Sequence, residues 1–355
     1  MTSLIELLGE GGAAALVGLF GGVLLGLAAR RGRFCTLGAI EDALYGNDWD
    51  RIRMWAVCLG TAIAGTFLLA ETGVVDLTAS VYLGTLWNPV ASVAGGLIFG
   101  YGMAIAGNCG YGALARLGGG DLRSFVIVIV TGISAYMILS GPLALARVSL
   151  FPIETATGPA AGGIAHLIAY GSGLPVLLFA LIVSGAMFAW AFAAPSFRAS
   201  PGQIGWAAVA GLAIVSGWAG TGLIASESFE GAGPGSHTFT APMGETILWL
   251  MTASGGGMGF AIGSVTGVVL GALIGSISKG HFRWEACDDP GELGRQIAGG
   301  ALMGIGGVLA LGCSVGQGLT AFSTLAYSAP ITLAAIFLGA AIGLRQLIRG
   351  FEAVG

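Results

Sequence analysis

The chain carries very little charge. Only 9% of its 355 residues are charged, against roughly 25% in an ordinary soluble domain. Hydrophobic residues make up 55% of the sequence, and the mean hydropathy is +0.88. A soluble protein of this length needs far more polar surface, so the soluble class is excluded. The composition predicts an all-α polytopic membrane protein.

Two further absences exclude particular classes of function. The chain has five cysteines, at positions 35, 58, 109, 287 and 313. They form no CxxC pair, so neither a metal cluster nor an exchanging dithiol is predicted. Acidic residues are missing from the middle of the apolar runs, apart from Glu245 near the start of one. Proton-coupled carriers normally keep an ionisable residue there, so we expect a channel-like route or a thiol relay, without metal, cofactor or enzymatic activity.

Nine apolar segments are long enough to cross a membrane. They cover about 12–29, 54–71, 89–107, 124–143, 174–194, 204–225, 243–278, 294–312 and 330–347. The seventh is too long for one straight span, and its run of three glycines at 255–257 predicts a short segment followed by a full span. With the N-terminus outside and the C-terminus cytoplasmic, nine crossings leave every basic residue except Arg147 on the inner side. This arrangement satisfies the positive-inside rule.

A glycine-rich pattern that includes one cysteine occurs twice without gaps. The first copy is Gly95, Gly96, Gly100, Gly102, Ala106, Cys109 and Gly112, and the second is Gly299, Gly300, Gly304, Gly306, Ala310, Cys313 and Gly316. The predicted topology gives the helices of the two copies opposite directions across the membrane. We therefore expect one transport domain over 1–355, built from two inverted pseudo-symmetric halves at about 1–144 and 174–355, an architecture common among transporters.

The cysteine of each copy lies at a predicted helix break followed by a short half-helix. The surrounding residues that we assign to these breaks are Gly107, Asn108, Gly110 and Gly112 in the first copy, and Gly312, Ser314, Gly316 and Gln317 in the second. The second half-helix is predicted over 319–327. Half-helix N-termini present free N–H groups that suit a small anion, and a thiol adds a soft, polarisable partner. Close packing of small residues is the alternative explanation for the glycines.

The remaining cysteines and two histidines are assigned by their context. Cys35 follows a span and precedes a short stretch at 36–45, which resembles the other two breaks. Cys58 lies within a span, where a cysteine usually acts as a small hydrophobe. Cys287 lies in an acidic loop and is assigned no role. His166 and His237 are expected to be solvated in outer loops.

Three cysteine motifs together resemble those of a known family. They are Arg33-Phe34-Cys35, Gly107-Asn108-Cys109-Gly110-Tyr111-Gly112, and Leu311-Gly312-Cys313-Ser314-Val315-Gly316-Gln317-Gly318. The chain resembles the YeeE/YedE family of bacterial inner-membrane transporters of sulfur compounds over nearly its whole length. The resemblance implies an hourglass-shaped protein in which thiosulfate passes Cys35, Cys109 and Cys313 by transient S–H···S contacts. It also implies a small cytoplasmic sulfur-carrier protein as partner, and it suggests no nucleic acid.

The sequence is compatible with two other functions. The substrate of such a path could be another soft solute, such as a selenium compound or sulfide. A membrane thiol oxidoreductase is the alternative from a different class, and it requires cysteine pairs with Cα atoms within about 7 Å. Thiosulfate fits the residues well, since its charge suits the helix ends and its terminal sulfur suits the thiols. Sulfate has the charge but lacks that sulfur, so thiols could separate the two anions.

Overall fold

The fold is helical throughout the part of the chain that the computed structural model describes, which is residues 2–155, 163–228, 233–286 and 289–352. The longer helices are α1 (Thr2–Gly32), α3 (Asp50–Glu71), α5 (Pro89–Ala106), α7 (Leu122–Leu139), α10 (Val176–Phe192), α12 (Pro201–Glu227), α13 (Thr240–Thr252), α14 (Phe260–Ser278), α15 (Pro290–Leu309) and α16 (Ser328–Glu352). The shorter ones are α2 (Thr36–Glu41), η1 (Asp42–Gly46), η2 (Leu77–Ala79), α4 (Val81–Gly84), α6 (Gly110–Leu117), α8 (Ala144–Leu150), α9 (Ile164–Ser172), α11 (Pro195–Arg198) and η3 (Gly316–Ala321). Cys287 falls outside the described residues.

Every one of the nine predicted spans is helical, and seven stretches of the described chain are long and apolar enough to cross a membrane. These seven are Ile5–Gly46, Asp50–Glu71, Pro89–Leu117, Leu122–Leu139, Pro201–Glu227, Phe260–Ser278 and Ser328–Arg349. The apolar helix α10 has 17 residues. Helix α15 carries Glu292 and Arg295 near its start, and its many glycines lower its hydropathy. The predicted break of the seventh segment is confirmed as a short α13 and a full-length α14.

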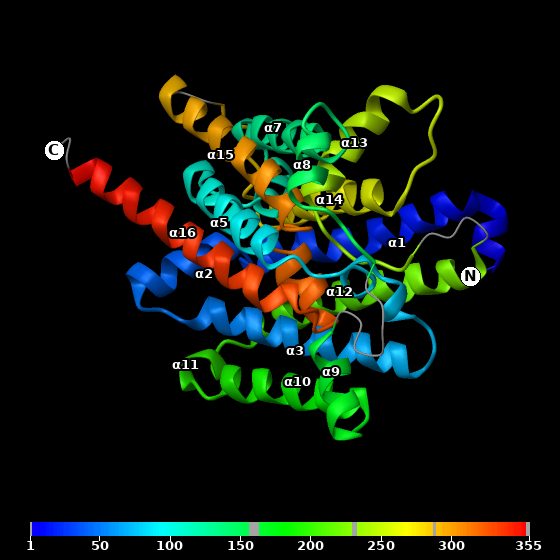
Figure 1. Cartoon of the computed structure of the whole chain (residues 1–355). Helices are drawn as coiled ribbons and strands as arrows, with labels where there is room; N and C mark the ends of the chain where they lie inside the picture. Colours follow the sequence, from blue (N-terminus) through cyan, green and yellow to red (C-terminus); the bar gives the residue numbers. More distant parts are fainter. Residues whose placement is uncertain (1, 156–162, 229–232, 287–288, 353–355) are drawn as a thin grey trace.

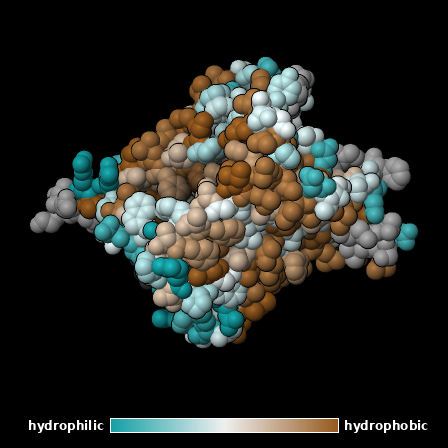
Figure 2. Space-filling model, turned by 90° about the horizontal axis from the view of Figure 1, so that it is seen from below, coloured by the Kyte–Doolittle hydropathy of each residue, from teal (hydrophilic) through white to brown (hydrophobic). Residues whose placement is uncertain are grey.

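The long helices pack side by side in one bundle (Figure 1). Helix α1 runs parallel to α14, because Cβ atoms added at Gly263, Gly267 and Gly271 would meet Ala15, Leu19 and Val23 in the same order. The N- and C-terminal ends of the chain lie at opposite ends of this bundle (Figure 1). Figure 2 shows broad brown, apolar surface across the molecule, with teal side chains grouped mainly toward its edges. Such a surface suits contact with lipid.

Helices α5 and α15 cross backbone against backbone. A Cβ added at Gly95 would lie 2.8 Å from the carbonyl oxygen of Gly306, and one added at Gly306 would lie 2.6 Å from that of Gly95. Gly102 and Gly299 repeat this exchange at 2.7 and 2.6 Å. These pairs make the two helices antiparallel. Small residues permit such an approach, which is how helices pack tightly in a membrane. Two glycines from each copy of the sequence repeat therefore form this interface, while Gly96 and Gly100 face α16, and Gly300 and Gly304 face α7.

We expect Gly306→Ala to destabilise the protein, because its new methyl group must push two backbones apart. Overpacking of this kind costs about 1–3 kcal/mol. Gly294→Ala is the matched control, since Gly294 lies on the same helix and an added Cβ there meets nothing within 4 Å. Thermal unfolding of the purified protein in detergent measures both variants. Equal melting temperatures for the two would contradict the close crossing.

One prediction about the histidines is wrong. The chain between α12 and α13 folds back into the bundle, and His237 is completely buried there. Its Nδ1 lies 2.6 Å from the hydroxyl of Ser264 on α14, and its carbonyl accepts a hydrogen bond from Thr320 at 2.6 Å. A buried polar ring needs such partners. The segment before α13 is therefore part of the core, not a solvated outer loop.

Candidate functional site

Cys35, Cys109 and Cys313 share one backbone geometry. Each follows by two positions a residue with left-handed φ, namely Arg33 (57°), Gly107 (76°) and Leu311 (55°). The carbonyl oxygen of each cysteine accepts a hydrogen bond from the N–H four residues later, at 3.2, 2.8 and 2.8 Å respectively. One helix thus ends and another helical turn begins at every one of these thiols, which confirms the predicted breaks. Cys58, by contrast, lies inside α3 and is fully buried.

The thiols of Cys109 and Cys313 cap the segments that follow them. The N–H of Gly112 donates to Sγ of Cys109 at 3.3 Å, and the N–H of Gly316 donates to Sγ of Cys313 at the same distance. Because each sulfur already accepts a bond, its own S–H proton is left to donate elsewhere. Both side chains are buried, at 0% and 1% exposure. These matched bonds give the two thiols the same orientation relative to their half-helices.

Hydroxyl groups connect the two buried thiols. Sγ of Cys109 lies 4.0 Å from the hydroxyl of Thr36, which donates to the hydroxyl of Ser314 at 3.2 Å. On the other side, the hydroxyl of Thr238 lies 3.8 Å from Sγ of Cys313. Thr36 and Ser314 are both completely buried. A short row of hydroxyl groups therefore runs from one helix break to the other, and these groups can donate to the oxygen atoms of an anion.

Cys35 opens onto a basic cavity. The cavity has a volume of about 310 Å³ and is lined by Cys35 and Asn108 together with four arginines. Cys35 is partly exposed and makes no cap to α2 with its side chain. Both Cys35 and Cys313 lie close enough to Cys109 to act on it electrostatically, so the three thiols lie in one region of the bundle. The four cysteines among the described residues are all free thiols.

The remaining residues that the sequence assigned to the breaks hold the backbone in place. Gln317 is buried and donates from Nε2 to the carbonyl oxygen of Ala310 at 2.7 Å, while its Oε1 accepts from Ser328 at 3.1 Å. It thereby ties the end of α15 to the start of α16. Gly107 and Gly312 have φ values of 76° and 155°, which favour glycine. Gly110 starts α6, and Gly112 supplies the N–H that caps Cys109.

The second half-helix begins earlier than predicted. Helical turns start at Gly316 and the segment η3 ends at Ala321, whereas the sequence suggested 319–327. The cap from Gly316 to Cys313 fixes this start. Thr324 and Leu325 already form a turn, and Leu325 has a left-handed φ of 53°. The half-helix is thus anchored at the thiol itself.

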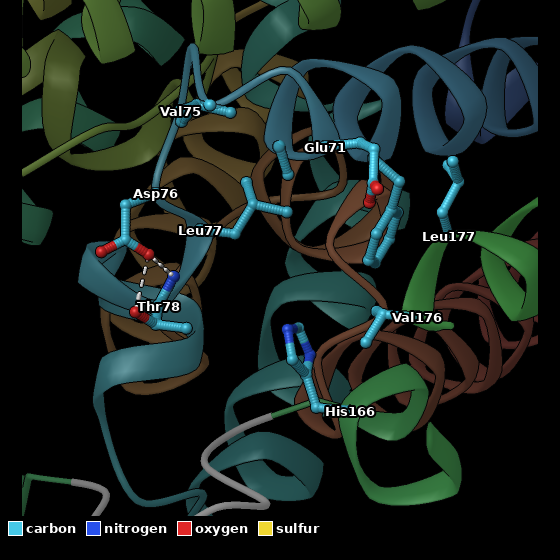
Figure 3. A pocket seen from close by; sticks show the side chains of 11 residues that line it. Glu71, Val75, Asp76, Leu77, Thr78, His166, Val176 and Leu177 are labelled. Atoms are coloured by element: carbon cyan, nitrogen blue, oxygen red, sulfur yellow. Dashed lines mark hydrogen bonds between the residues drawn. The ribbon is translucent and has the colours of Figure 1, made fainter. Parts of the chain in front are cut away.

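A larger cavity, of about 350 Å³, lies away from the thiols at the end of α3 (Figure 3). Its lining includes the carboxylates of Glu71 and Asp76, and the Asp76 side chain accepts hydrogen bonds from Thr78. Figure 3 shows His166 pointing from α9 toward this space. Burial lowers the pKa of His166, so its ring is neutral at pH 7. The described lining of this cavity carries two carboxylates and no lysine or arginine, which makes it unsuitable for a dianion.

Sequence reasoning missed three side chains next to the thiols. Thr36, Thr238 and Tyr82 surround the two breaks, and the Tyr82 hydroxyl lies 3.6 Å from where a Cβ of Gly316 would stand. Thr36 directly follows Cys35, so its position beside a predicted site residue is a signal that the sequence contains. Thr238 and Tyr82 come from distant segments, and only the folded chain brings them to Cys313.

Comparison with known proteins agrees with this geometry. The family model described as sulphur transport matches residues 31–342. The chain belongs to this sulphur transport family. It is 29% identical to the thiosulfate transporter TsuA of Spirochaeta thermophila over 334 residues, which cover 90% of this chain and 94% of the relative. It is 25% identical to the thiosulfate transporter TsuA of Escherichia coli K12, with 91% and 92% covered. The resemblance to the YeeE/YedE family is confirmed, and the protein is a multi-pass membrane protein of a transport family.

Proposed function

We propose that this protein takes up thiosulfate, or a closely related sulfur anion, across the bacterial inner membrane. The observation that carries the proposal is the series of three thiols at equivalent helix breaks, two of them oriented by matching N–H···S bonds. The names of the two relatives give the substrate class. In the proposed orientation the anion meets Cys313 first, then Cys109 and then Cys35.

The chemistry of the path suits an anion with one soft end and one hard end. S–H protons at Cys109 and Cys313 contact the terminal sulfur of thiosulfate, because that sulfur is the soft, polarisable acceptor. The hydroxyls of Thr36, Ser314 and Thr238 donate to its oxygens, and donors to a charged acceptor are worth about 1.5–3 kcal/mol each. Sulfate would satisfy the hydroxyls but leave the thiols without a sulfur partner.

Two inverted halves are part of the same proposal. By the repeat, Gly95 and Gly102 of α5 correspond to Gly299 and Gly306 of α15, respectively. In the structure the contacts are exchanged, because Gly95 packs on Gly306 and Gly102 packs on Gly299. An axis in the membrane plane between the two helices would produce this exchange. The positive-inside rule supports an outer N-terminus and a cytoplasmic C-terminus. The single domain over 1–355 and an hourglass shape complete the proposal.

Uptake of ³⁵S-labelled thiosulfate into proteoliposomes containing the purified protein tests the function. We expect uptake that unlabelled thiosulfate competes away and that excess external sulfate leaves nearly unchanged. Selenosulfate and sulfide, added as competitors, test the alternative soft solutes. A protein that takes up sulfate as fast as thiosulfate would contradict thiol-based selection. Liposomes without protein provide the background.

The oxidoreductase alternative has its own readout. That mechanism forms a disulfide during turnover, whereas the proposed path keeps its thiols reduced. Free thiols are therefore counted by alkylation after incubation with a quinone, with and without thiosulfate. We expect the same number in both samples. Loss of two thiols in step with quinone reduction would favour the oxidoreductase.

A further inference from the structure

The cavity beside Cys35 has a feature that the thiol path does not explain. Among the described residues, four arginines line it, Arg30, Arg33, Arg51 and Arg116, against a single carboxylate, Glu41. The positive-inside rule accounts for basic residues on this side of the membrane. It does not account for their convergence on one cavity.

The positive charge of this cavity is poorly compensated. Arg51 pairs with Asp42 at 3.0 Å, and the guanidinium of Arg30 donates to the neutral hydroxyl of Ser276 at 2.7 Å. Arg116 is close enough to Arg30 to repel it, while the carboxylates of Glu285 and Asp121 offset part of this repulsion. Among the described residues, Arg33 and Arg116 form no ion pair. Mutual repulsion of this kind is relieved by an anion between the cations.

A buried amide supplies the second, independent observation. Asn108 lines the same cavity and is 3% exposed, yet its Oδ1 has no hydrogen-bond partner among the described residues. Buried amides are rarely left so. The two ends of an asparagine amide are interchangeable by rotation about χ2, so this position can present an N–H donor to an anion. Asn108 directly precedes Cys109, which places the amide between the thiol path and the arginines.

The size of the cavity fits a small hydrated dianion. A volume of about 310 Å³ exceeds that of a tetrahedral oxyanion and leaves room for several waters at about 30 Å³ each. Guanidinium groups bind tetrahedral oxyanions through paired N–H bonds. Among the described residues, Cys35 is the one thiol on the wall of this cavity, and it is partly exposed. Recognition here therefore depends on charge and oxygen atoms, with little demand for a terminal sulfur.

We propose that this arginine cavity, defined by Arg30, Arg33, Arg51, Arg116 and Asn108, is a second anion site that binds doubly charged oxyanions from the inner side, sulfate included. The inference rests on the proposed function only for the direction of the path. It separates two tasks along one route: the buried thiols select for sulfur, and the arginine cavity holds any dianion at the inner mouth. Sulfate from inside then occupies the cavity, although sulfate from outside does not pass the thiols.

Protection of Cys35 tests the site without measuring transport. Full-length protein carrying Cys287→Ser is placed in inside-out vesicles and alkylated with an uncharged maleimide, and mass spectrometry follows Cys35. Sodium sulfate at tenfold its dissociation constant should slow the reaction about tenfold. Sodium chloride at equal ionic strength should not. Right-side-out vesicles with sulfate outside should show unchanged alkylation.

Two variants and a control decide the outcome. Arg116→Gln should abolish protection by sulfate, and Arg116→Lys should keep part of it because the charge remains. Arg198→Gln is the control, since Arg198 is an exposed basic residue of α11 and does not line the cavity. Equal protection in the wild type and in Arg116→Gln, or none in the wild type, would overturn the site. Thiosulfate uptake is measured on the same preparations, so failure of uptake with intact protection would count against the proposed function alone.

Discussion

Cells that depend on this protein for thiosulfate should stop growing on thiosulfate as sole sulfur source when Cys109 or Cys313 is replaced by alanine. Each substitution removes the cap on a half-helix and, on the proposed path, the thiol that contacts the terminal sulfur of the substrate. We expect uptake to fall about 100-fold, since the lost contact to a charged substrate costs about 1.5–3 kcal/mol and the lost cap costs about 1 kcal/mol more. Uptake of labelled thiosulfate by the same cells measures the effect.

Serine variants separate the two roles of the thiol. In Cys109→Ser the hydroxyl can still accept the N–H of Gly112, so the half-helix keeps its cap while the soft sulfur is lost. We expect folding to be retained and uptake to remain low. Cys58→Ala is the matched control, because Cys58 is equally buried but lies within α3 away from the breaks. It should support growth, and normal uptake in Cys109→Ser would contradict a role for sulfur chemistry.

Thr36→Val should lower thiosulfate uptake about tenfold. Valine preserves the shape of threonine but removes the hydroxyl that lies between Cys109 and Ser314. One donor to a charged acceptor is worth about 1.5–3 kcal/mol, which corresponds to roughly ten- to 100-fold. The loss should be seen as a higher KM if the hydroxyl binds the anion in its ground state. Concentration series in proteoliposomes give KM and the maximal rate.

Thr36→Ser and Thr61→Val are the controls for this variant. Serine restores the hydroxyl and should recover most of the uptake. The hydroxyl of Thr61 bonds only within its own helix, to the carbonyl of Val57 at 2.9 Å, so its loss should change little. If Thr36→Val and Thr36→Ser behaved alike, packing and not the hydroxyl would explain the effect.

Much of the site could be predicted because its residues are close in the sequence. Cys109 and Cys313 lie beside glycines whose conformational freedom marks a break, and Cys35 follows a span in a similar context. The helix breaks are local events, so local patterns reveal them. The nine apolar segments were identifiable for the same reason, because each needs only its own composition to be recognised.

The partners of those residues could not be predicted in the same way. The sequence predicts a solvated His237 because this residue falls in an outer loop between two predicted spans. In the folded chain that segment turns inward, and hydrogen bonds to Ser264 and Thr320 stabilise it there. Thr238 meets Cys313 only through this inward turn. Such contacts depend on how distant helices pack, and no local pattern encodes them.

The crossing of α5 and α15 bears on how substrate moves. Their glycines meet backbone to backbone, so no side chain is available there to repack and let one helix slide along the other. A rocking movement of whole halves would have to open this contact and lose its close backbone packing. We therefore expect the bundle to stay rigid while small side chains at the breaks admit one anion at a time. Flow through such a conduit follows the concentration gradient in either direction, so the cell sets net import by how quickly it consumes the anion inside.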